Sequence, residues 1–104
     1  MIKKKLVLLV ALIGISFFVN AQDRFRGEPS LCYYEEKITF YNDFTFKLWE
    51  NGVLVLSGTY KYNKAKGVID CTTRNGDEFQ MKSVVEQHGV LQRATFRGYF
   101  WNHC

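Results

Sequence analysis

Apolar and polar side chains alternate along residues 37–62, which read KITFYNDFTFKLWENGVLVLSGTYKY. A period of two places alternate side chains on opposite faces of a β-strand, and the many aromatic and β-branched residues favour strand over helix. Polar residues interrupt the alternation at Asn42-Asp43 and again at Asn51-Gly52. The pattern therefore predicts three consecutive antiparallel strands joined by two tight turns.

The lengths of these turns decide whether the large apolar side chains share one face. An Asn-Gly pair favours a two-residue type I′ turn, which would pair Trp49 with Leu54 and turn Leu48 away from Leu54. A three-residue loop pairs Leu48 with Leu54 instead, and a one-residue slip would expose the whole apolar set. We therefore expect three-residue loops at both turns, which leaves Phe44 at a position that favours glycine.

Three more strands are predicted downstream, over residues 67–73, 77–85 and 90–101, with loops at 63–66, 74–76 and 86–89. Their inward-facing residues are expected to be Ile69, Cys71, Phe79, Met81, Val85, Ala94, Phe96, Gly98 and Phe100. No amphipathic helical pattern appears after the first 21 residues. The sequence thus predicts an all-β fold, a six-stranded antiparallel meander with one strongly apolar face.

An open sheet would leave that apolar face in water, because no helix is predicted to cover it. Curling the meander into a small barrel or half-barrel covers the face and removes the exposed edges. Gly58 and Gly98 fall on the inward face, where strong bending favours small residues. The alternative is a curved open sheet that buries its face in a dimer.

The succession of ITF, a short Asn/Asp turn, FTFKLW, NG and LSGTYKY resembles the small secreted lipocalin-like domains of bacteria. The resemblance covers residues 37–70 and lies in hairpins, so it implies a fold rather than a chemistry. It implies a β-barrel that acts as a binding protein. The chain departs from a full lipocalin in length, because it has too few residues for eight strands and a helix.

The first 21 residues have the three parts of a secretory signal peptide. Residues 3–5 are lysines, residues 6–19 form an apolar run, and Asn20-Ala21 precedes Gln22 as a small-residue cleavage site. The alternative is a membrane anchor, but the run is shorter than the roughly 18–20 residues that a spanning helix needs. We therefore expect an exported protein, periplasmic or extracellular, with no stable membrane anchor after cleavage.

After cleavage, residues 22–104 would form one small β domain, with residues 22–30 as a flexible lead-in. The leader holds three of the 14 lysine and arginine residues and none of the 10 acidic residues, so the mature chain carries a net charge of +1. The basic character of the whole chain belongs to the leader. It gives no indication of a nucleic-acid partner.

Three cysteines, Cys32, Cys71 and Cys104, would meet an oxidising compartment and allow one disulfide with three possible pairings. Cys71 is in phase with the inward residue Ile69, so we expect it to be a buried, inert thiol. Cys32 precedes the first strand and Cys104 follows the last. These two ends meet if the sheet closes, which predicts a Cys32–Cys104 bridge.

No catalytic residue, metal site or cofactor is predicted. His88 and His103 lack the paired spacing of a zinc site, and we expect both to be solvated. The adjacent carboxylates Glu35-Glu36 and Asp77-Glu78 would point to opposite faces of a strand, so neither pair forms a shared acid–base site.

The predicted outer face is the candidate binding surface. The last strand would present Leu91, Arg93, Thr95, Arg97, Tyr99 and Trp101 outward. Arginine, tyrosine and tryptophan anchor many interfaces, and the candidate binding residues are Trp49, Arg93, Arg97, Tyr99 and Trp101. The alternative for these residues is ordinary cross-strand packing, with arginine stems lying over aromatic rings.

We therefore expect an exported, non-catalytic binding or interaction module of the bacterial envelope. Its partner would be a protein, an envelope glycan or a small apolar ligand, and a dimer is possible. The alternative is an envelope inhibitor or structural protein that acts through its outer Arg/Trp/Tyr face. A hydrolase with residues gathered from loops is a third hypothesis.

Overall fold

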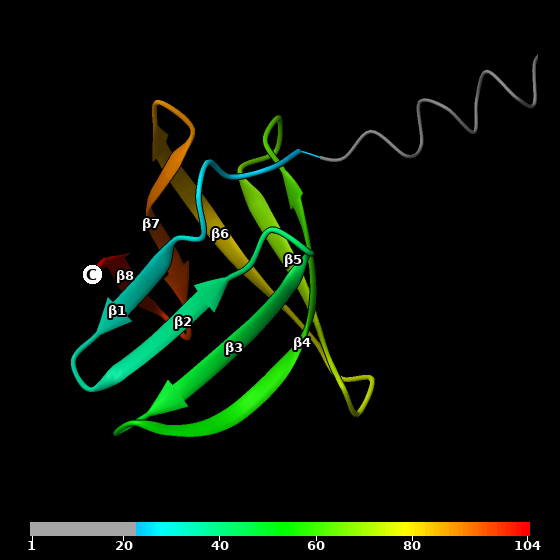
Figure 1. Cartoon of the computed structure of the whole chain (residues 1–104). Helices are drawn as coiled ribbons and strands as arrows, with labels where there is room; N and C mark the ends of the chain where they lie inside the picture. The colour runs from blue at the N-terminus through cyan, green and yellow to red at the C-terminus, as the bar shows by residue number, and fades with distance from the viewer. Residues whose placement is uncertain (1–22) are drawn as a thin grey trace, which may run out of the picture.

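The computed structural model describes residues 23–104, which form an antiparallel barrel closed where the last strand pairs with the first (Figure 1). The eight strands are β1 Ser30–Tyr33, β2 Glu36–Phe40, β3 Thr45–Glu50, β4 Val53–Asn63, β5 Val68–Thr73, β6 Glu78–Gln87, β7 Val90–Phe96 and β8 Tyr99–His103. Each strand pairs with its neighbour in sequence. The all-β antiparallel barrel is confirmed, whereas the predicted signal peptide lies outside the described residues. Within residues 23–104, no helix has the length and apolar character to cross a membrane.

The predicted number of six strands is wrong because the first and last predicted strands each fold back into a hairpin. The 90–101 stretch divides at Arg97-Gly98, where both residues have positive φ, 53° and 79°, as a type I′ turn requires. Gly98 therefore serves a turn rather than an inward bend. The early stretch divides at Tyr34-Glu35, with Tyr34 at φ 51°. Eight strands fit this chain because several have only four to six residues.

The turn between β3 and β4 has two residues, not the predicted three. Glu50 pairs with Val53, and the intervening Asn51 and Gly52 both have positive φ. The apolar register is restored by a β-bulge: Leu48 pairs with Leu56 while Trp49 pairs with Leu54, so β4 holds one extra residue. The local turn preference and the core are both satisfied, and the cost is that Leu54 lies outside the barrel.

Two other turns confirm the predicted register. Phe40 pairs with Phe46 across the β2–β3 loop, and Phe44 adopts the expected left-handed conformation at φ 64°. Across the β5–β6 loop, Cys71 pairs with Phe79, as predicted. The β4–β5 loop is shifted by two residues from the prediction, with Tyr62 opposite Ile69. A shift of two residues leaves each side chain on its predicted face.

Irregularities in β6 and β7 overturn several predicted orientations. Ser83 has φ 52° at a register shift in β6, and Val85 beyond it is half-exposed rather than inward. A second shift opposite β7 turns Leu91 into the core instead of outward. The Arg97-Gly98 turn reverses the alternation again, so Phe100 faces solvent while Trp101 is buried with 1% exposure. Each extra residue exchanges the two faces downstream of it.

Side chains from every strand fill the barrel interior. The buried apolar core consists of Phe25, Leu31, Ile38, Phe40, Phe46, Leu48, Tyr60, Tyr62, Ile69, Cys71, Met81, Leu91, Ala94, Phe96 and Trp101. Gly58 faces this interior opposite Phe46, as predicted, at the point where β4 bends. The inward set is therefore largely that of the sequence pattern, with Phe25, Leu31, Leu91 and Trp101 added and Leu54, Val85, Gly98 and Phe100 lost.

Residues 23–29 cover one end of the barrel, and we call this end the capped end (Figure 1). The expectation of a flexible lead-in is wrong, because Phe25 is buried and its ring stacks 4.2 Å from that of Tyr62. The segment also bonds to the three loops at this end through Arg26 N to Gly89 O at 2.8 Å, Lys64 N to Asp23 Oδ2 at 2.9 Å and Asn42 N to Glu28 Oε2 at 3.0 Å.

The predicted Cys32–Cys104 disulfide is confirmed, with the two Cα atoms 5.2 Å apart. It ties β1 to the end of β8, next to the strand pair that closes the barrel. Cys71 is free and buried, and burial raises the pKa of its thiol well above the usual range. A thiol with a raised pKa is a poor nucleophile at neutral pH, which agrees with the expected inert role.

Candidate functional site

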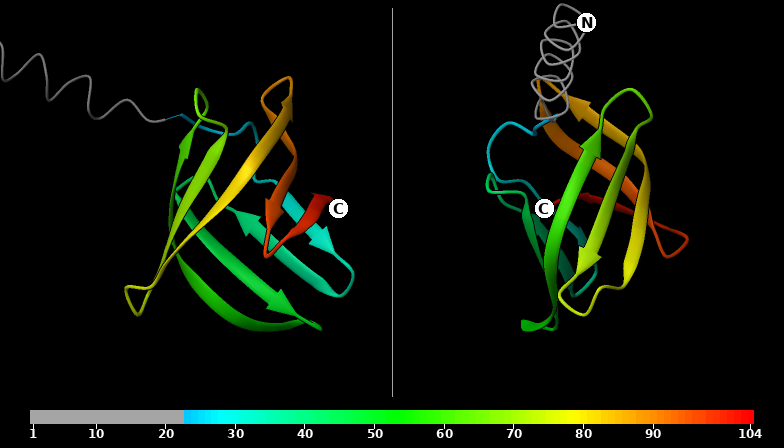
Figure 2. Two further views of the ribbon diagram at one scale, coloured as in Figure 1. Left: turned by 180° about the vertical axis from the view of Figure 1, so that it is seen from behind. Right: turned by 90° about the vertical axis from the view of Figure 1, so that its right-hand side faces the viewer.

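Four hairpin turns lie at the other end of the barrel, and we call this end the open end (Figure 2). Contacts join three of them, the β1–β2, β3–β4 and β7–β8 turns. The β1–β2 and β3–β4 turns are joined by a hydrogen bond from Asn51 N to Glu35 O at 3.0 Å. The β7–β8 turn reaches across to the end of β3, where Arg97 Nη1 lies 3.5 Å from Glu50 Oε1. These contacts bring residues distant in sequence onto one small surface.

Three tyrosines cluster at the open end. The Tyr33 ring stacks on Tyr99 with centroids 4.7 Å apart and meets Tyr34 edge-on at 4.7 Å. Tyr34 is 88% exposed, and Tyr99 is also exposed, so their rings are available to a partner. We define the open-end patch as Tyr33, Tyr34, Glu36, Glu50, Arg97 and Tyr99.

The patch has a rigid aromatic base. Tyr33 stacks on the buried Trp101 at 5.7 Å, and Trp101 packs on Phe96 at 5.5 Å. Trp101 Nε1 donates a hydrogen bond to the Phe96 carbonyl oxygen at 3.2 Å, which fixes the indole. Phe96 in turn contacts Phe79 at 4.9 Å, and the Arg97 guanidinium lies 4.8 Å above the Phe96 ring. A surface held in this way loses little conformational entropy when it binds.

Tyr34 is held in a costly conformation without being needed for the core. Its φ of 51° lies in the left-handed region, where a large non-glycine residue costs roughly 1–3 kcal/mol. A strained, almost fully exposed aromatic residue is a feature from which a functional role can be inferred.

The pKa of Tyr33, which lies beside Tyr34, is raised above its usual value. Burial is the main cause, and the neighbouring Tyr99, Tyr34 and Glu36 add to it. The Tyr33 hydroxyl is protonated at neutral pH, as that of an ordinary tyrosine is, and can donate a hydrogen bond.

Two of the five predicted binding residues belong to the open-end patch. Arg97 occupies the β7–β8 turn and pairs with Glu50, and Tyr99 stacks on Tyr33. Tyr33, Tyr34, Glu36 and Glu50 were not predicted as site residues. The adjacent tyrosines Tyr33-Tyr34 were a visible signal, but no turn was expected there.

The other three predicted residues lie elsewhere. Trp101 is inside the barrel, so its predicted outward position is wrong. Trp49 is half-buried on the outer face of β3, with Lys37 Nζ 4.8 Å above its ring. Arg93 is exposed on β7, where its Nε donates to Asn102 Oδ1 at 2.7 Å. The single outer Arg/Trp/Tyr face expected from sequence is therefore dispersed over the molecule.

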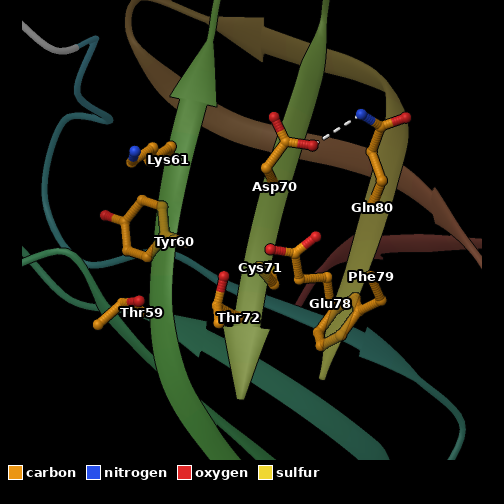
Figure 3. A pocket seen from close by; sticks show the side chains of 9 residues that line it. All are labelled: Thr59, Tyr60, Lys61, Asp70, Cys71, Thr72, Glu78, Phe79 and Gln80. Atoms are coloured by element: carbon orange, nitrogen blue, oxygen red, sulfur yellow. Dashed lines mark hydrogen bonds between the residues drawn. The ribbon is translucent and has the colours of Figure 1, made fainter. Parts of the chain in front are cut away.

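Two surface depressions lie outside the barrel. One, of about 580 Å³, covers the outer face of β4, β5 and β6 (Figure 3). Its lining residues are Thr59, Tyr60, Lys61, Asp70, Cys71, Thr72, Glu78, Phe79 and Gln80. Gln80 Nε2 donates to Asp70 Oδ1 at 2.7 Å, which occupies part of the polar surface. The depression carries both charge signs and opens to solvent, so it suggests no specific ligand.

A second depression, of about 620 Å³, lies over β6, β7 and β8 beside Arg93 and Asn102. Arg93 Nε donates to Asn102 Oδ1, and no cluster of tyrosine rings like that at the open end lines this depression. Among residues 23–104, no three His, Cys, Asp or Glu side chains are grouped to hold a metal ion. The open-end patch is therefore the better candidate for a binding surface.

Comparisons with protein-family models, with curated proteins and with solved structures found no match to this chain. The resemblance to lipocalin-like domains thus stays a prediction.

Proposed function

We propose that this chain is an exported, non-catalytic interaction module of the bacterial envelope that contacts a partner protein through the open-end patch. The exposed tyrosine cluster on its rigid aromatic base is the observation that carries the proposal. Tyrosine and arginine are enriched among the anchors of protein interfaces. The patch combines three tyrosines with the partly exposed Arg97–Glu50 ion pair.

A protein partner fits this surface better than a small apolar ligand. The barrel interior is filled by buried side chains such as Phe40, Phe46 and Trp101, which leaves the rim as the place of contact. The proposed lipocalin-like character is therefore one of architecture, with binding at the barrel end. The alternative of an outer Arg/Trp/Tyr face loses support because Trp101 is buried and the other residues are dispersed.

The composition of the patch favours binding over catalysis. It offers ring faces, hydroxyl groups and one ion pair. The Cys71 thiol is buried among core residues, His88 lies in the β6–β7 turn at the capped end, and His103 ends β8. These groups do not converge with the patch on a common point, as an acid–base or nucleophilic mechanism would require.

Export is supported by the disulfide as well as by the leader sequence. Disulfides persist in the periplasm and outside the cell and are rare in the cytosol. The Cys32–Cys104 bridge links β1 to the residue after β8, and the pairing of these two strands closes the barrel. Reduction of the bridge to free thiols would leave this closing pair less constrained. The proposed location is therefore periplasmic or extracellular.

The proposal is tested by quantitative capture of envelope proteins on immobilised residues 22–104. The double variant Tyr34→Ser/Tyr99→Ser should reduce recovery of the captured partner by at least about tenfold, because it removes two interface anchors. Phe100→Ser is the matched control, because Phe100 is 59% exposed against 55% for Tyr99 but lies on the outer face of β8. Equal recovery with wild type and the double variant would reject the open-end patch as the contact surface.

A further inference from the structure

The first half of β4 is paired on one side only. β4 pairs with β5 from Gly58 to Asn63, whereas residues 53–56 pair with β3 alone. Figures 1 and 2 show this half curving along β3 while the β5–β6 hairpin projects away from it. The last backbone hydrogen bond between β4 and the β5–β6 hairpin runs from Arg74 N to Ser57 O at 3.0 Å. Residues 53–56 therefore present a free strand edge.

Gly58 marks the point where the two strands separate. A Cβ atom at this position would collide with the Thr72 carbonyl oxygen of β5. The glycine thus allows β5 to approach β4 closely on one side of the bend and to leave it on the other. The free edge is consequently part of the barrel's construction and not a frayed end.

This edge is apolar and without charge. Val53, Leu54 and Val55 are all exposed, and the segment between Glu50 and Lys61 contains no charged residue. Monomeric proteins usually protect such an edge with lysine, proline or bulges. The bulge within this segment is the only such device here, and it limits regular pairing to a few residues.

We propose that this edge pairs with the same edge of a second copy of the chain, in an antiparallel two-fold arrangement centred on Leu54. Two-fold symmetry places identical segments against each other, which requires a self-complementary surface. The segment meets this requirement, because apolar residues face apolar residues and no like charges are opposed. The net charge of +1 on residues 22–104 adds little repulsion between copies.

The length of the edge determines the strength of the dimer. Ser57 O already accepts a bond from Arg74 N, so the paired segment extends no further than residues 53–56. Such a contact falls below the roughly 1,200 Å² buried by stable complexes. The dimer is therefore weak and reversible. This inference goes beyond the proposed function, and the edge shares no residue with the open-end patch.

Analytical ultracentrifugation of residues 22–104 with the disulfide intact tests the proposal. Wild type should show a monomer–dimer equilibrium between low micromolar and millimolar concentration. Leu54→Lys should weaken the dimer by at least about tenfold, because two-fold pairing brings the two introduced charges together. Val85→Lys is the matched control, with Val85 50% exposed against 49% for Leu54 but placed on β6, and it should leave the equilibrium unchanged.

A charge-swap experiment separates pairing from a loss of fold. Mixing Leu54→Lys with Leu54→Glu should restore association, since opposite charges then meet across the two-fold axis. Hydrogen exchange of the peptide covering residues 53–57 should slow as protein concentration rises. A wild type that stays monomeric throughout would overturn the proposal. So would equal weakening by Val85→Lys, failure of the mixed variants to associate, or unchanged exchange in residues 53–57.

Discussion

At the scale of single residues, a few positions carry conformations that their neighbours impose. Positive φ occurs at Tyr34, Phe44, Ser83 and Arg97, none of which is a residue type that favours it. Phe44 is compensated by packing, because its ring contacts Tyr60 and lies 4.7 Å beneath the Arg24 guanidinium. Tyr34 has no comparable burial, which is why we assign it a role in binding.

Gly58→Ala should lower the free energy of unfolding by roughly 1–3 kcal/mol, the range for forcing an extra carbon into a packed site. The new methyl group would meet backbone atoms of Thr72 and Thr73, which cannot move aside without breaking strand pairing. Urea unfolding followed by circular dichroism measures the change. Ser57→Ala, one residue earlier, is the control. A change below about 0.5 kcal/mol in Gly58→Ala would contradict the close approach of β5.

Raising the pH should destabilise the fold above about pH 9. Burial raises the pKa of Cys71 above its usual 9.0 and raises the pKa of Tyr60 from 10.0 to about 12. Above pH 9 the unfolded chain therefore binds fewer protons than the native chain, so native stability, complete below this pH, falls progressively.

Urea unfolding at about pH 8 and about pH 10.5 measures this loss. The double variant Cys71→Ala/Tyr60→Phe should lose less stability than wild type over the same interval, because neither substituted side chain can ionise. An equal loss in both proteins would show that other groups cause the alkaline effect.

At the scale of elements, turn preference and core register are reconciled by bulges. Asn51-Gly52 adopts its favoured two-residue turn, and one extra residue in β4 returns Leu48 and Leu56 to the same face. A regular hairpin without a bulge would satisfy only one of these two demands. A bulge costs little in a strand whose other edge is free, so the chain satisfies both.

The N-terminal segment is an element that the pattern of alternation did not reveal. Residues 23–29 contain a single large apolar residue, Phe25, and a single buried side chain has no period to detect. Its partners are loops from three hairpins at the capped end. Only the assembled barrel brings those loops together.

Phe25→Ala should lower the free energy of unfolding by about 3 kcal/mol, near the lower limit for removing a buried phenylalanine. The Phe25 ring packs against Phe40, Tyr60 and Tyr62 at centroid distances of 6.0, 6.3 and 4.2 Å. Arg26→Ala is the control, because Arg26 bonds to Gly89 through its backbone nitrogen. If thermal or urea unfolding showed no difference between the two variants, residues 23–29 would not cap the barrel.

At the scale of the whole molecule, closure of the barrel makes a filled core possible in a small domain. A chain of this size buries a modest share of its surface, so it gains much from one covalent constraint. The Cys32–Cys104 bridge spans 72 residues and holds β1 against β8. The same closure brings the β1–β2 and β7–β8 turns together and so creates the open-end patch.

Replacing both bridged cysteines, Cys32→Ser/Cys104→Ser, should lower the free energy of unfolding by about 4 kcal/mol in the chain-entropy model. Urea unfolding of the variant, compared with oxidised wild type, measures the loss. Reduced wild type should match the variant. A loss below about 1 kcal/mol would mean that strand pairing alone closes the barrel.

The sequence by itself determined the strand-rich class, the antiparallel order and most of the core, because alternation and turn residues act locally. The disulfide followed from the expected closure of the sheet, which brings its first and last strands together. Tertiary structure alone decided the strand number, the burial of Trp101 and the exposure of Leu54. Alternation defines faces only between one turn or bulge and the next, and each extra residue exchanges them. The turn at Tyr34-Glu35 and the bulge at Ser83 also escaped prediction, because Tyr34 and Ser83 have positive φ, which neither residue type favours.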